Sequence, residues 1–398
     1  MSHRVAVIGG GASGLTAAIS AAQSGADVTV YESGARVGRK ILATGNGRCN
    51  MTNINADIKH YHGNDPQFIL GVKNRFWVNE TLDFFFSLGV LARVEEEGRV
   101  YPFSSQASAV LDVLRFGAEA HNVKTICSFE VSKVKKQGNA FKITAYDGRE
   151  AVADRVIIAA GGRAAPDFGS KGGGHEILKS LGHTITPLRP SLVQLKTDKD
   201  DVKSLKGIRV QASVTIGKHT EKGEIQFTDY GLSGVCVFNL SAYYTDEKTV
   251  SLDLLSDYSY ESVAEMMWTR VANNPDLPLE EFFTGLLPKR VGQAILKQAG
   301  IAPLSRKAVT LGESEVEKLS KMLKHWEFKI NGTMSWNNAQ VTRGGALTDE
   351  FNPVTLESRK VSGLYAAGEV LDIDGDCGGY NLQWAWASGY IAGKNAAK

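Results

Sequence analysis

The chain has 398 residues, of which 43% are hydrophobic and 22% charged, and its formal net charge is +2. This composition is ordinary for a soluble globular protein, and the length exceeds that of one average domain. Lysine and arginine are scattered rather than gathered in a stripe, so we expect no nucleic-acid partner. No apolar run approaches the ~20 residues of a membrane span, and no signal peptide precedes the first predicted strand. We therefore expect no membrane partner and a cytoplasmic location.

Cysteine and histidine spacing argues against a metal site. The four cysteines lie far apart and include no CxxC pair, which disfavours a zinc site and a disulfide framework and favours a reducing compartment. The eight histidines include no i, i+4 pair of the zinc-binding kind. We expect no bound metal.

The start of the chain predicts a strand, a helix and a second strand in succession. Val5–Ile8 is a short apolar run rich in branched side chains, which suits a strand buried on both faces. Leu15–Ser24 is small and apolar, as a helix packed closely on a sheet must be, and Gly25 ends it. Ala26–Tyr31 predicts the second strand. This order is typical of a dinucleotide-binding unit.

The connection between the first strand and the helix carries a glycine pattern. Gly9, Gly11 and Gly14 fit G-x-G-x-x-G, which allows a tight turn, backbone approach to a pyrophosphate and close helix packing. Glu32 ends the second strand, where an acidic side chain accepts ribose hydroxyls and repels a 2′-phosphate. FAD or NAD is therefore expected rather than NADP. The predicted cofactor contacts are Gly9, Gly11, Ala12, Ser13, Gly14, Glu32 and Ser33.

The later parts of the chain favour FAD. Val361–Asp372 predicts a buried strand followed by Gly-Glu, and it resembles the second flavin motif of the glutathione-reductase-like fold. Ala153–Gly162 resembles the strand and Ala-Gly-Gly segment of those flavoproteins. Short strands near Phe129–Val134 and Phe141–Tyr146 resemble their small meander, where backbone meets adenine. The implied contacts are Val131, Ala160, Gly161, Gly162, Gly368 and Glu369.

Asp374–Ala397 predicts the last helix, whose start contains the pair Gly378-Gly379. Free backbone N–H groups at such a helix N-terminus could stabilise the negative N1–C2=O edge of a reduced flavin. Trp384 and Trp386 are interpreted as core residues. The predicted cofactor contacts are Gly379, Tyr380, Asn381 and Leu382.

Several segments together resemble one family of flavoproteins over nearly the whole chain. They are GRKILATGNGRCNMTN (Gly38–Asn53), GRVYPFSSQA (Gly98–Ala107), the Ala-Gly-Gly segment within Ala153–Gly162, QFTDYGLSGVCVFNLS (Gln226–Ser241), VTRGGALTDEFNPVTLESRKVSGLYAAGEVLDIDG (Val341–Gly375) and GGYNLQWAWASGY (Gly378–Tyr390). On these segments the chain is similar to the BaiN/RdsA (YhiN-like) family of NAD(P)/FAD-dependent oxidoreductases. That family also contains an aminoacetone-oxidase-like branch.

The resemblance implies an α/β fold with a Rossmann-like FAD domain of glutathione-reductase type, built from both chain ends, residues 1–190 and 340–398. Residues 191–260 would form an inserted β-rich domain, and residues 261–339 a small helical subdomain. The sequence pattern agrees with this division. It predicts strands at Val210–Ile216, Gly223–Thr228, Val235–Leu240 and Thr249–Leu254, and helices at Glu261–Asn273, Leu279–Leu286, Lys289–Gly300 and Glu313–Leu323.

The segment Thr44–Asn53 is irregular, and the resemblance implies that its first half runs past the flavin ring. Gly45 and Gly47 would let backbone N–H groups reach the N5/O4 edge. Arg48 could neutralise the reduced flavin or orient a substrate, or it could only tie the loop to a carboxylate. Cys49 is interpreted as a small buried hydrophobe rather than a nucleophile. The implied contacts in this region are Arg39, Lys40, Thr44, Gly45, Asn46, Gly47 and Asn50.

We therefore predict an FAD-dependent oxidoreductase with NAD(P)H as electron donor. Hydride transfer through flavin N5 would reduce an enone or another C=C bond, of the steroid or bile-acid type with which BaiN-like members are associated. Arg48 and Tyr380 are the candidate catalytic residues, with packing as the other explanation for the Tyr380 phenol. Phe168–Ile177 is glycine-rich but lacks the flanking elements of a second Rossmann site. A nicotinamide would thus reach the flavin without a domain of its own.

Two other functions stay open from the sequence. One is an oxidase that takes hydride from a small amine such as aminoacetone and produces hydrogen peroxide. The other is a flavin-bound redox-sensing or binding module without turnover. The expected partner of the reductase is a small-molecule substrate, and the oligomeric state stays open.

Overall fold

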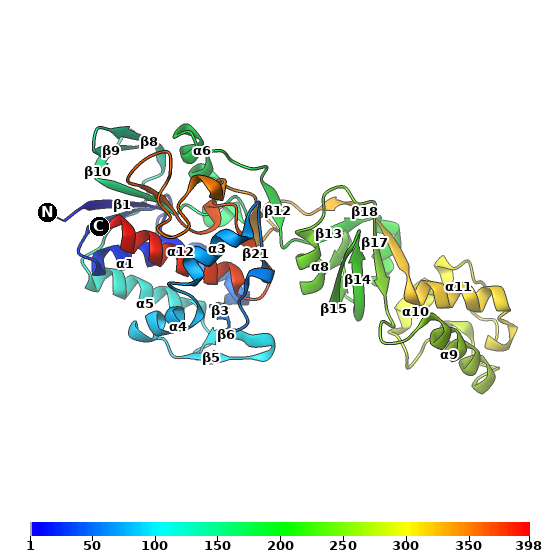
Figure 1. The fold of residues 1–398 in the computed structure, drawn as a ribbon. Helices are drawn as coiled ribbons and strands as arrows, with labels where there is room; N and C mark the ends of the chain where they lie inside the picture. Colours follow the sequence, from blue (N-terminus) through cyan, green and yellow to red (C-terminus); the bar gives the residue numbers. More distant parts are fainter. Residues whose placement is uncertain (1) are drawn as a thin grey trace. The chain divides into compact units, whose positions relative to one another are not determined.

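The computed structural model describes residues 2–398, and the chain divides into two compact units. The first unit combines the chain up to Pro190 with Ala339–Lys398, and the second unit is Ser191–Asn338. Figure 1 shows both chain ends within the first unit. Each unit has its own hydrophobic core.

A five-stranded parallel sheet forms the centre of the first unit, in the order β20-β11-β1-β2-β7. The central strands β1 and β11 are almost entirely buried, as parallel strands covered on both faces must be. The sheet draws strands from both ends of the chain, and the unit has a Rossmann-type α/β fold. The strands are β1 Arg4–Ile8, β2 Asp27–Tyr31, β7 Lys124–Ile126, β11 Arg155–Ile158 and β20 Leu364–Ala366.

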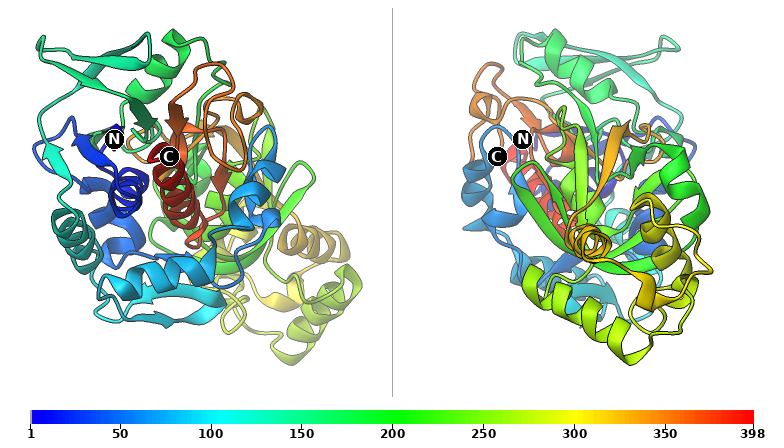
Figure 2. Two further views of the ribbon diagram at one scale, coloured as in Figure 1. Left: turned by 60° about the vertical axis from the view of Figure 1, so that its left-hand side comes forward. Right: turned by 90° about the vertical axis from the view of Figure 1, so that its right-hand side faces the viewer.

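Two helices from opposite chain ends pack against each other beside this sheet. They are α1 (Ala12–Gln23) and α12 (Tyr380–Ala396), which Figure 1 and the left view of Figure 2 draw side by side. Gly389 and Gly393 of α12 make the approach possible, because a Cβ on either would overlap a backbone carbonyl oxygen of α1. Their i, i+4 spacing places both glycines on one face of the helix.

Smaller elements complete the first unit. An antiparallel meander has the order β10-β9-β8, and short sheets pair β3-β6-β5, β21-β4 and β12-β19. These strands are β3 Thr52–Asn53, β4 Tyr61–His62, β5 Ala92–Val94, β6 Arg99–Pro102, β8 Val131–Gln137, β9 Ala140–Ala145, β10 Glu150–Ala153, β12 Arg189–Ser191, β19 Val341–Arg343 and β21 Asp374–Gly375. The helices are α2 Arg39–Ala43, α3 Ile69–Lys73, α4 Val78–Ser87, α5 Ala107–Ala120 and α6 Gly173–Ser180.

The second unit is a closed six-stranded barrel with helices, in the strand order β13-β16-β15-β14-β17-β18. Strand β18 pairs with both β17 and β13 and so closes the barrel. The strands are β13 Leu195–Thr197, β14 Arg209–Ile216, β15 His219–Phe227, β16 Gly231–Ser233, β17 Thr249–Asp253 and β18 Trp326–Thr333. The helices are α7 Lys199–Val202, α8 Val235–Ser241, α9 Tyr260–Asn273, α10 Lys289–Gln298 and α11 Glu313–Lys324.

Two predicted elements of this unit were wrong. Val235–Leu240 was predicted as a strand but forms helix α8, because its buried residues Cys236, Val237 and Leu240 follow helical rather than alternating spacing. Leu279–Leu286 was predicted as a helix but contains only a short 3-10 turn at Leu279–Glu281. The segment expected to form a helical subdomain also supplies β18 to the barrel, so helices and barrel belong to one compact unit. The residue limits of a separate subdomain stay a prediction.

Candidate cofactor and active site

The turn after β1 is built from glycines with different steric surroundings. Gly9 has φ +105°, and a Cβ on it would lie 2.6 Å from the carbonyl oxygen of Ala159. A Cβ on Gly14 would overlap the carbonyl oxygen of Gly9. Gly11 differs, because a Cβ built there meets no heavy atom of residues 2–398 within 4 Å. The first two glycines serve the fold, whereas the open space at Gly11 suits close approach by a ligand.

The first turn of α1 follows Gly11 and has backbone N–H groups that no side chain caps. Ala12 and Ser13 begin the helix, and no side chain caps its N-terminus. An uncapped helix N-terminus attracts anions such as a pyrophosphate. A Cβ on Gly368 would lie 2.6 Å from Ser13 Oγ, so the end of β20 packs directly on the same turn.

Glu32 is fixed at the end of β2 by backbone donors. Its carboxylate accepts the N–H of Gly10 at 2.8 Å and the N–H of Gly34 at 2.7 Å. The hydroxyl of Ser33 donates to the same carboxylate at 3.2 Å. These bonds orient the carboxylate beside the glycine turn, which suits the ribose-binding role predicted for it.

Lys40 and Glu369 join the two chain ends. Lys40 Nζ lies 2.9 Å from Glu369 Oε2, and Glu369 Oε1 accepts the N–H of Thr342 at 2.7 Å. A Cβ on Gly162 would lie 2.7 Å from Glu369 Oε1. The N-terminal, Ala-Gly-Gly and C-terminal motifs therefore converge on this carboxylate.

The other predicted contacts of the nucleotide end lie around this point. Arg39 donates to the carbonyl oxygen of Asp167 at 2.6 Å. Ala160 and Gly161 follow β11, and Gly161 has φ +70°. Val131 is buried at the start of β8 in the meander.

The loop that contains Thr44 to Asn50 has a strained backbone. Gly45, Asn46 and Gly47 all have positive φ, at 56°, 55° and 84°. A Cβ on Gly45 would lie 2.8 Å from the N atom of Asn50, so glycine is required there. Thr44 donates its hydroxyl to the Ile41 carbonyl at 2.7 Å and anchors the start of the loop.

Arg48 is held by other protein groups. Its Nη2 lies 2.5 Å from Glu95 Oε1, and its guanidinium lies 4.0 Å from the centroid of the Tyr101 ring. Arg93 shares the same carboxylate at 2.9 Å. The hydrogen bond with Glu95 raises the pKa of Arg48, which stays fully charged. Of the two roles considered from the sequence, this geometry matches the one that ties the loop to a carboxylate.

Cys49 is a buried thiol. Its side chain is fully inaccessible, and burial raises its pKa to about 12. Because a thiolate rather than a thiol is the nucleophile, this cysteine is poorly suited to covalent or redox chemistry. Within residues 2–398 none of the four cysteines forms a disulfide.

The N-terminus of α12 follows a pair of glycines. No side chain caps it, and Gly378 and Gly379 have φ of 142° and 100°. A Cβ on Gly379 would lie 2.5 Å from the Thr52 carbonyl oxygen and 2.9 Å from Asn50 Oδ1. Asn381 bridges the preceding loop by accepting the Gly375 N–H at 2.8 Å, and Leu382 is half-buried. The loop carrying Asn50 therefore meets this helix start.

Tyr380, the other candidate catalytic residue, contacts different protein groups from those that hold Arg48. The Tyr380 ring stacks on the His60 imidazole, with centroids 4.3 Å apart and planes 14° apart. Its backbone carbonyl accepts the hydroxyl of Tyr61 at 3.0 Å. Burial is the main cause that raises the pKa of the Tyr380 phenol, which makes it a weaker acid.

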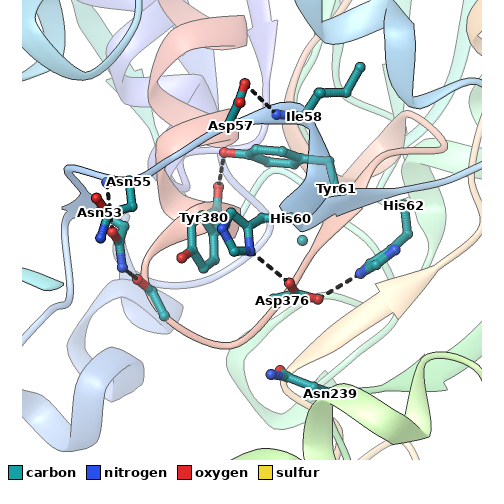
Figure 3. Close-up of polar contacts among 12 residues, drawn as sticks. Asn53, Asn55, Asp57, Ile58, His60, Tyr61, His62, Asn239, Asp376 and Tyr380 are labelled. Carbon is teal, nitrogen blue, oxygen red and sulfur yellow. Dashed lines mark hydrogen bonds and ion pairs between the residues drawn. The ribbon is translucent and has the colours of Figure 1, made fainter. Parts of the chain in front are cut away.

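A cluster of histidines and aspartates beside Tyr380 was missed by the sequence reasoning. Asp376 accepts from His60 Nδ1 at 3.0 Å and from His62 Nε2 at 2.7 Å, as Figure 3 shows. The sequence feature that could have indicated this cluster is a repeat at every second residue, with histidine at 60 and 62 and aspartate at 372, 374 and 376. Helical i, i+4 spacing does not include residues that are two apart, and only the pairing of β4 with β21 brings these two segments together.

These features fit FAD. The open space at Gly11, the oriented Glu32 carboxylate and two uncapped helix starts match a dinucleotide with an anionic middle and a polar ring system. Within residues 2–398 no group of three or more His, Cys, Asp or Glu side chains could hold a metal ion.

Comparison with known proteins places these features in a family. The HI0933-like protein Rossmann domain family matches residues 3–395. A 3-dehydro-bile acid delta(4,6)-reductase of Clostridium scindens is 41% identical over 409 residues, which cover 100% of this chain and 99% of the relative. A ribosomal RNA dihydrouridine synthase of Haemophilus influenzae is 32% identical, with 96% of each chain covered.

A solved structure supports the fold alone. The 3-ketosteroid-delta4-(5alpha)-dehydrogenase of Rhodococcus jostii RHA1, in complex with 4-androstene-3,17-dione, has a TM-score of 0.51 and 16% identity. The alignment covers 100% of this chain and 97% of that one.

The expectation of no nucleic-acid partner is not supported by these findings, because two relatives are named ribosomal RNA dihydrouridine synthase. That expectation rested on the scattered positions of lysine and arginine, which show only that basic residues are not clustered along the sequence. Among the helices of residues 2–398, none combines the length and the apolar character needed to cross a lipid bilayer. The cytoplasmic location stays a prediction.

Proposed function

This chain belongs to the HI0933-like protein Rossmann family and is an FAD-dependent oxidoreductase, and on that premise we propose that it reduces an electron-poor C=C bond. The substrate class we propose is an enone of the steroid or bile-acid type, with NAD(P)H as the electron donor. The observation that carries the proposal is the 41% identity, end to end, with the bile-acid delta(4,6)-reductase.

The residues of the chain have defined parts in this proposal. Gly11 and the start of α1 would bind the pyrophosphate, Glu32 would bind a ribose, and the start of α12 would face the flavin ring. When bound, FAD would supply the hydride-transfer chemistry of the reduction through its N5 atom, with NAD(P)H as the source of the hydride. Lys40 and Glu369 would hold the region between nucleotide and ring in place by their ion pair of 2.9 Å. We also propose that the FAD domain built from both chain ends is of glutathione-reductase type.

A second candidate function is the synthesis of dihydrouridine in ribosomal RNA. The observation in its favour is the identity of 32% with the Haemophilus influenzae enzyme over 96% of both chains. Both candidate reactions add hydrogen across a C=C bond conjugated with a carbonyl group, so one flavin site could serve either. The higher identity to the bile-acid enzyme ranks the small-molecule substrate first.

Anaerobic stopped-flow absorbance tests the proposal. NADH and NADPH should each be mixed with the FAD-loaded protein, and the reduced protein should then be mixed with a 3-oxo-Δ4,6 bile acid. We expect bleaching by at least one nucleotide and reoxidation by the enone. Reoxidation only by uridine-containing ribosomal RNA would favour the second candidate. Hydrogen peroxide formed from aminoacetone in air, without bleaching by either nucleotide, would instead identify an amine oxidase.

A further inference from the structure

Strands β4 and β21 form a short antiparallel ladder that gathers four titratable side chains. His62 lies opposite Asp374, and the N–H of Asp376 donates to the carbonyl of His60 at 2.9 Å. His60 ends the 3-10 turn before β4, and Asp376 directly follows β21. The Asp376 carboxylate contacts both imidazoles, and we call His60, His62, Asp374 and Asp376 together the His–Asp ladder.

The central carboxylate of the ladder fixes how both imidazoles are protonated. Asp376 Oδ2 lies 3.0 Å from His60 Nδ1, and Asp376 Oδ1 lies 2.7 Å from His62 Nε2. An ionised carboxylate can only accept, so each of these nitrogens must carry a proton. The neutral rings then have opposite tautomers, with the proton on Nδ1 in His60 and on Nε2 in His62. His60 is left with Nε2 as the nitrogen that can gain and lose a proton.

His60 lies beside the start of α12. Its ring stacks on Tyr380, the first residue of α12, at a centroid distance of 4.3 Å. The His60 side chain is 23% exposed, so water can reach it, whereas His62 is 9% exposed. Figure 3 shows His60 between Tyr380 and Asp376. The ladder is thus one aromatic ring away from the helix start predicted to face the flavin.

Other charged and titratable groups act on this cluster. Asp374 is 1% exposed, and Arg343 Nη1 lies 3.9 Å from its carboxylate. The groups that act electrostatically on Tyr380 are Asp376, Arg99, Glu97 and Cys377. The cluster therefore contains both signs of charge, and Asp376 is the carboxylate that contacts the imidazoles directly.

We propose that His60 is the proton donor of the reduction described above, and that Asp376 and His62 are its positioning residues. This inference rests on the proposed function. In the step, His60 acts as the imidazolium, protonated on both nitrogens. Its Nε2–H bond breaks, the electron pair of that bond stays on the nitrogen, and the proton forms a C–H bond at the carbon next to the substrate carbonyl, which leaves the neutral ring with its proton on Nδ1. The hydride that adds to the other carbon brings both electrons of the reduction from reduced flavin. Water then returns a proton to His60.

Other candidates for this role are less suitable. The raised pKa of Tyr380 keeps its phenol protonated and makes proton release costly at neutral pH. Arg48 is tied to Glu95 at 2.5 Å. An imidazole exchanges protons near neutral pH, which is what repeated proton delivery requires.

The first test reads the tautomers without any substrate. In ¹⁵N-labelled, FAD-loaded protein at about pH 8.5, where imidazoles are neutral, we expect a protonated Nδ1 in His60 and a protonated Nε2 in His62. Asp376→Ala should return His60 to the common Nε2–H tautomer. A wild-type His60 with its proton on Nε2 would overturn the proposal.

The second test separates the two half-reactions. His60→Gln should leave bleaching by NAD(P)H within about twofold of wild type, but slow reoxidation by the enone about 100-fold, as loss of a general acid does. His219→Gln is the matched control, because it removes a similar stack in the second unit, in which the ring centroids of His219 and Tyr243 lie 3.8 Å apart. The control should reoxidise like the wild type.

The outcomes distinguish this inference from the function on which it rests. Equal reoxidation rates in wild type and His60→Gln would overturn the donor role and leave the reductase intact. A wild type that bleaches but is not reoxidised by the enone would overturn the reductase and the donor role together. If His60→Gln does not retain FAD, Asp376→Asn should show the slowed reoxidation, and the wild-type tautomers still decide the proposal.

Discussion

Two parts of the first unit are built in opposite ways. The turn from Gly9 to Gly14 is made of backbone, and its requirements are steric, because a Cβ on Gly9 or Gly14 would collide with main-chain oxygens. The His–Asp ladder is made of side chains, and its requirements are electrostatic, because Asp376 holds two imidazoles at 3.0 and 2.7 Å. Because of this difference, we expect substitutions in the two parts to have different effects. A substitution in the turn should damage binding and folding, whereas an isosteric substitution in the ladder should leave the shape and change the response to pH.

The largest effect is expected from Gly14→Ala. The added Cβ would overlap the carbonyl oxygen of Gly9, so the turn and α1 must move apart. We expect the protein to lose about 3 kcal/mol of stability, as overpacked sites do, and to bind FAD at least about 100-fold more weakly. Urea unfolding of the FAD-free protein and flavin fluorescence titration measure the two effects.

Gly11→Ala is the matched control for this prediction. Its Cβ would meet no heavy atom of residues 2–398 within 4 Å, so the FAD-free protein should unfold as the wild type does. Binding should still weaken, because the methyl group would occupy space that the pyrophosphate needs. Equal losses of stability in both variants would show that the two glycines do not divide their roles in this way.

The same contrast explains what the sequence could predict. The glycine turn, β1, α1 and β2 are contiguous, so their pattern is complete within a short stretch of sequence. The His–Asp ladder joins His60 to Asp376 across a sequence separation of 316 residues, and only the pairing of β4 with β21 brings them together. Local pattern also misled at Val235–Leu240, where β-branched residues lie in α8 because burial follows helical spacing. The roles assigned to individual cofactor contacts stay predictions.

Asp374 of the ladder should make the stability of the protein depend on pH. Burial raises the pKa of this carboxyl from 3.8 to about 6, and neither oxygen has a hydrogen-bond partner within residues 2–398. Between pH 4 and 6 the folded protein keeps a proton that the unfolded chain has lost, so stability falls as the pH rises through this window. We expect Asp374→Asn to remove a loss on the order of 3 kcal/mol. Urea unfolding at pH 4, 5, 6 and 7 measures it, and parallel pH curves for the two proteins would contradict it.

The Lys40–Glu369 ion pair tests whether side chains also stabilise the part of the first unit where the motifs from the two chain ends meet. Its partners are 27% and 20% exposed, so solvent weakens their attraction. A double-mutant cycle with Lys40→Met and Glu369→Gln should give a coupling of about 1 kcal/mol in urea unfolding. Glu369→Gln alone should cost more than Lys40→Met, because it also weakens the bond from the Thr342 N–H at 2.7 Å. A coupling of zero would mean that the convergence of the chain ends depends on glycine packing alone.

The smallest effect is expected at Cys49, which lies next to Arg48 but belongs to the core. Its thiol is fully buried with a pKa of about 12, so the reactive thiolate is nearly absent at neutral pH. Cys49→Ala should change enone-driven reoxidation by less than about twofold, while the small cavity costs on the order of 1 kcal/mol of stability. In the native wild type, iodoacetamide should label Cys49 only after unfolding, as read by peptide mass spectrometry. Rapid labelling in the folded state, together with loss of turnover in Cys49→Ala, would place this cysteine with the reactive side chains of the ladder rather than with the steric framework of the turn.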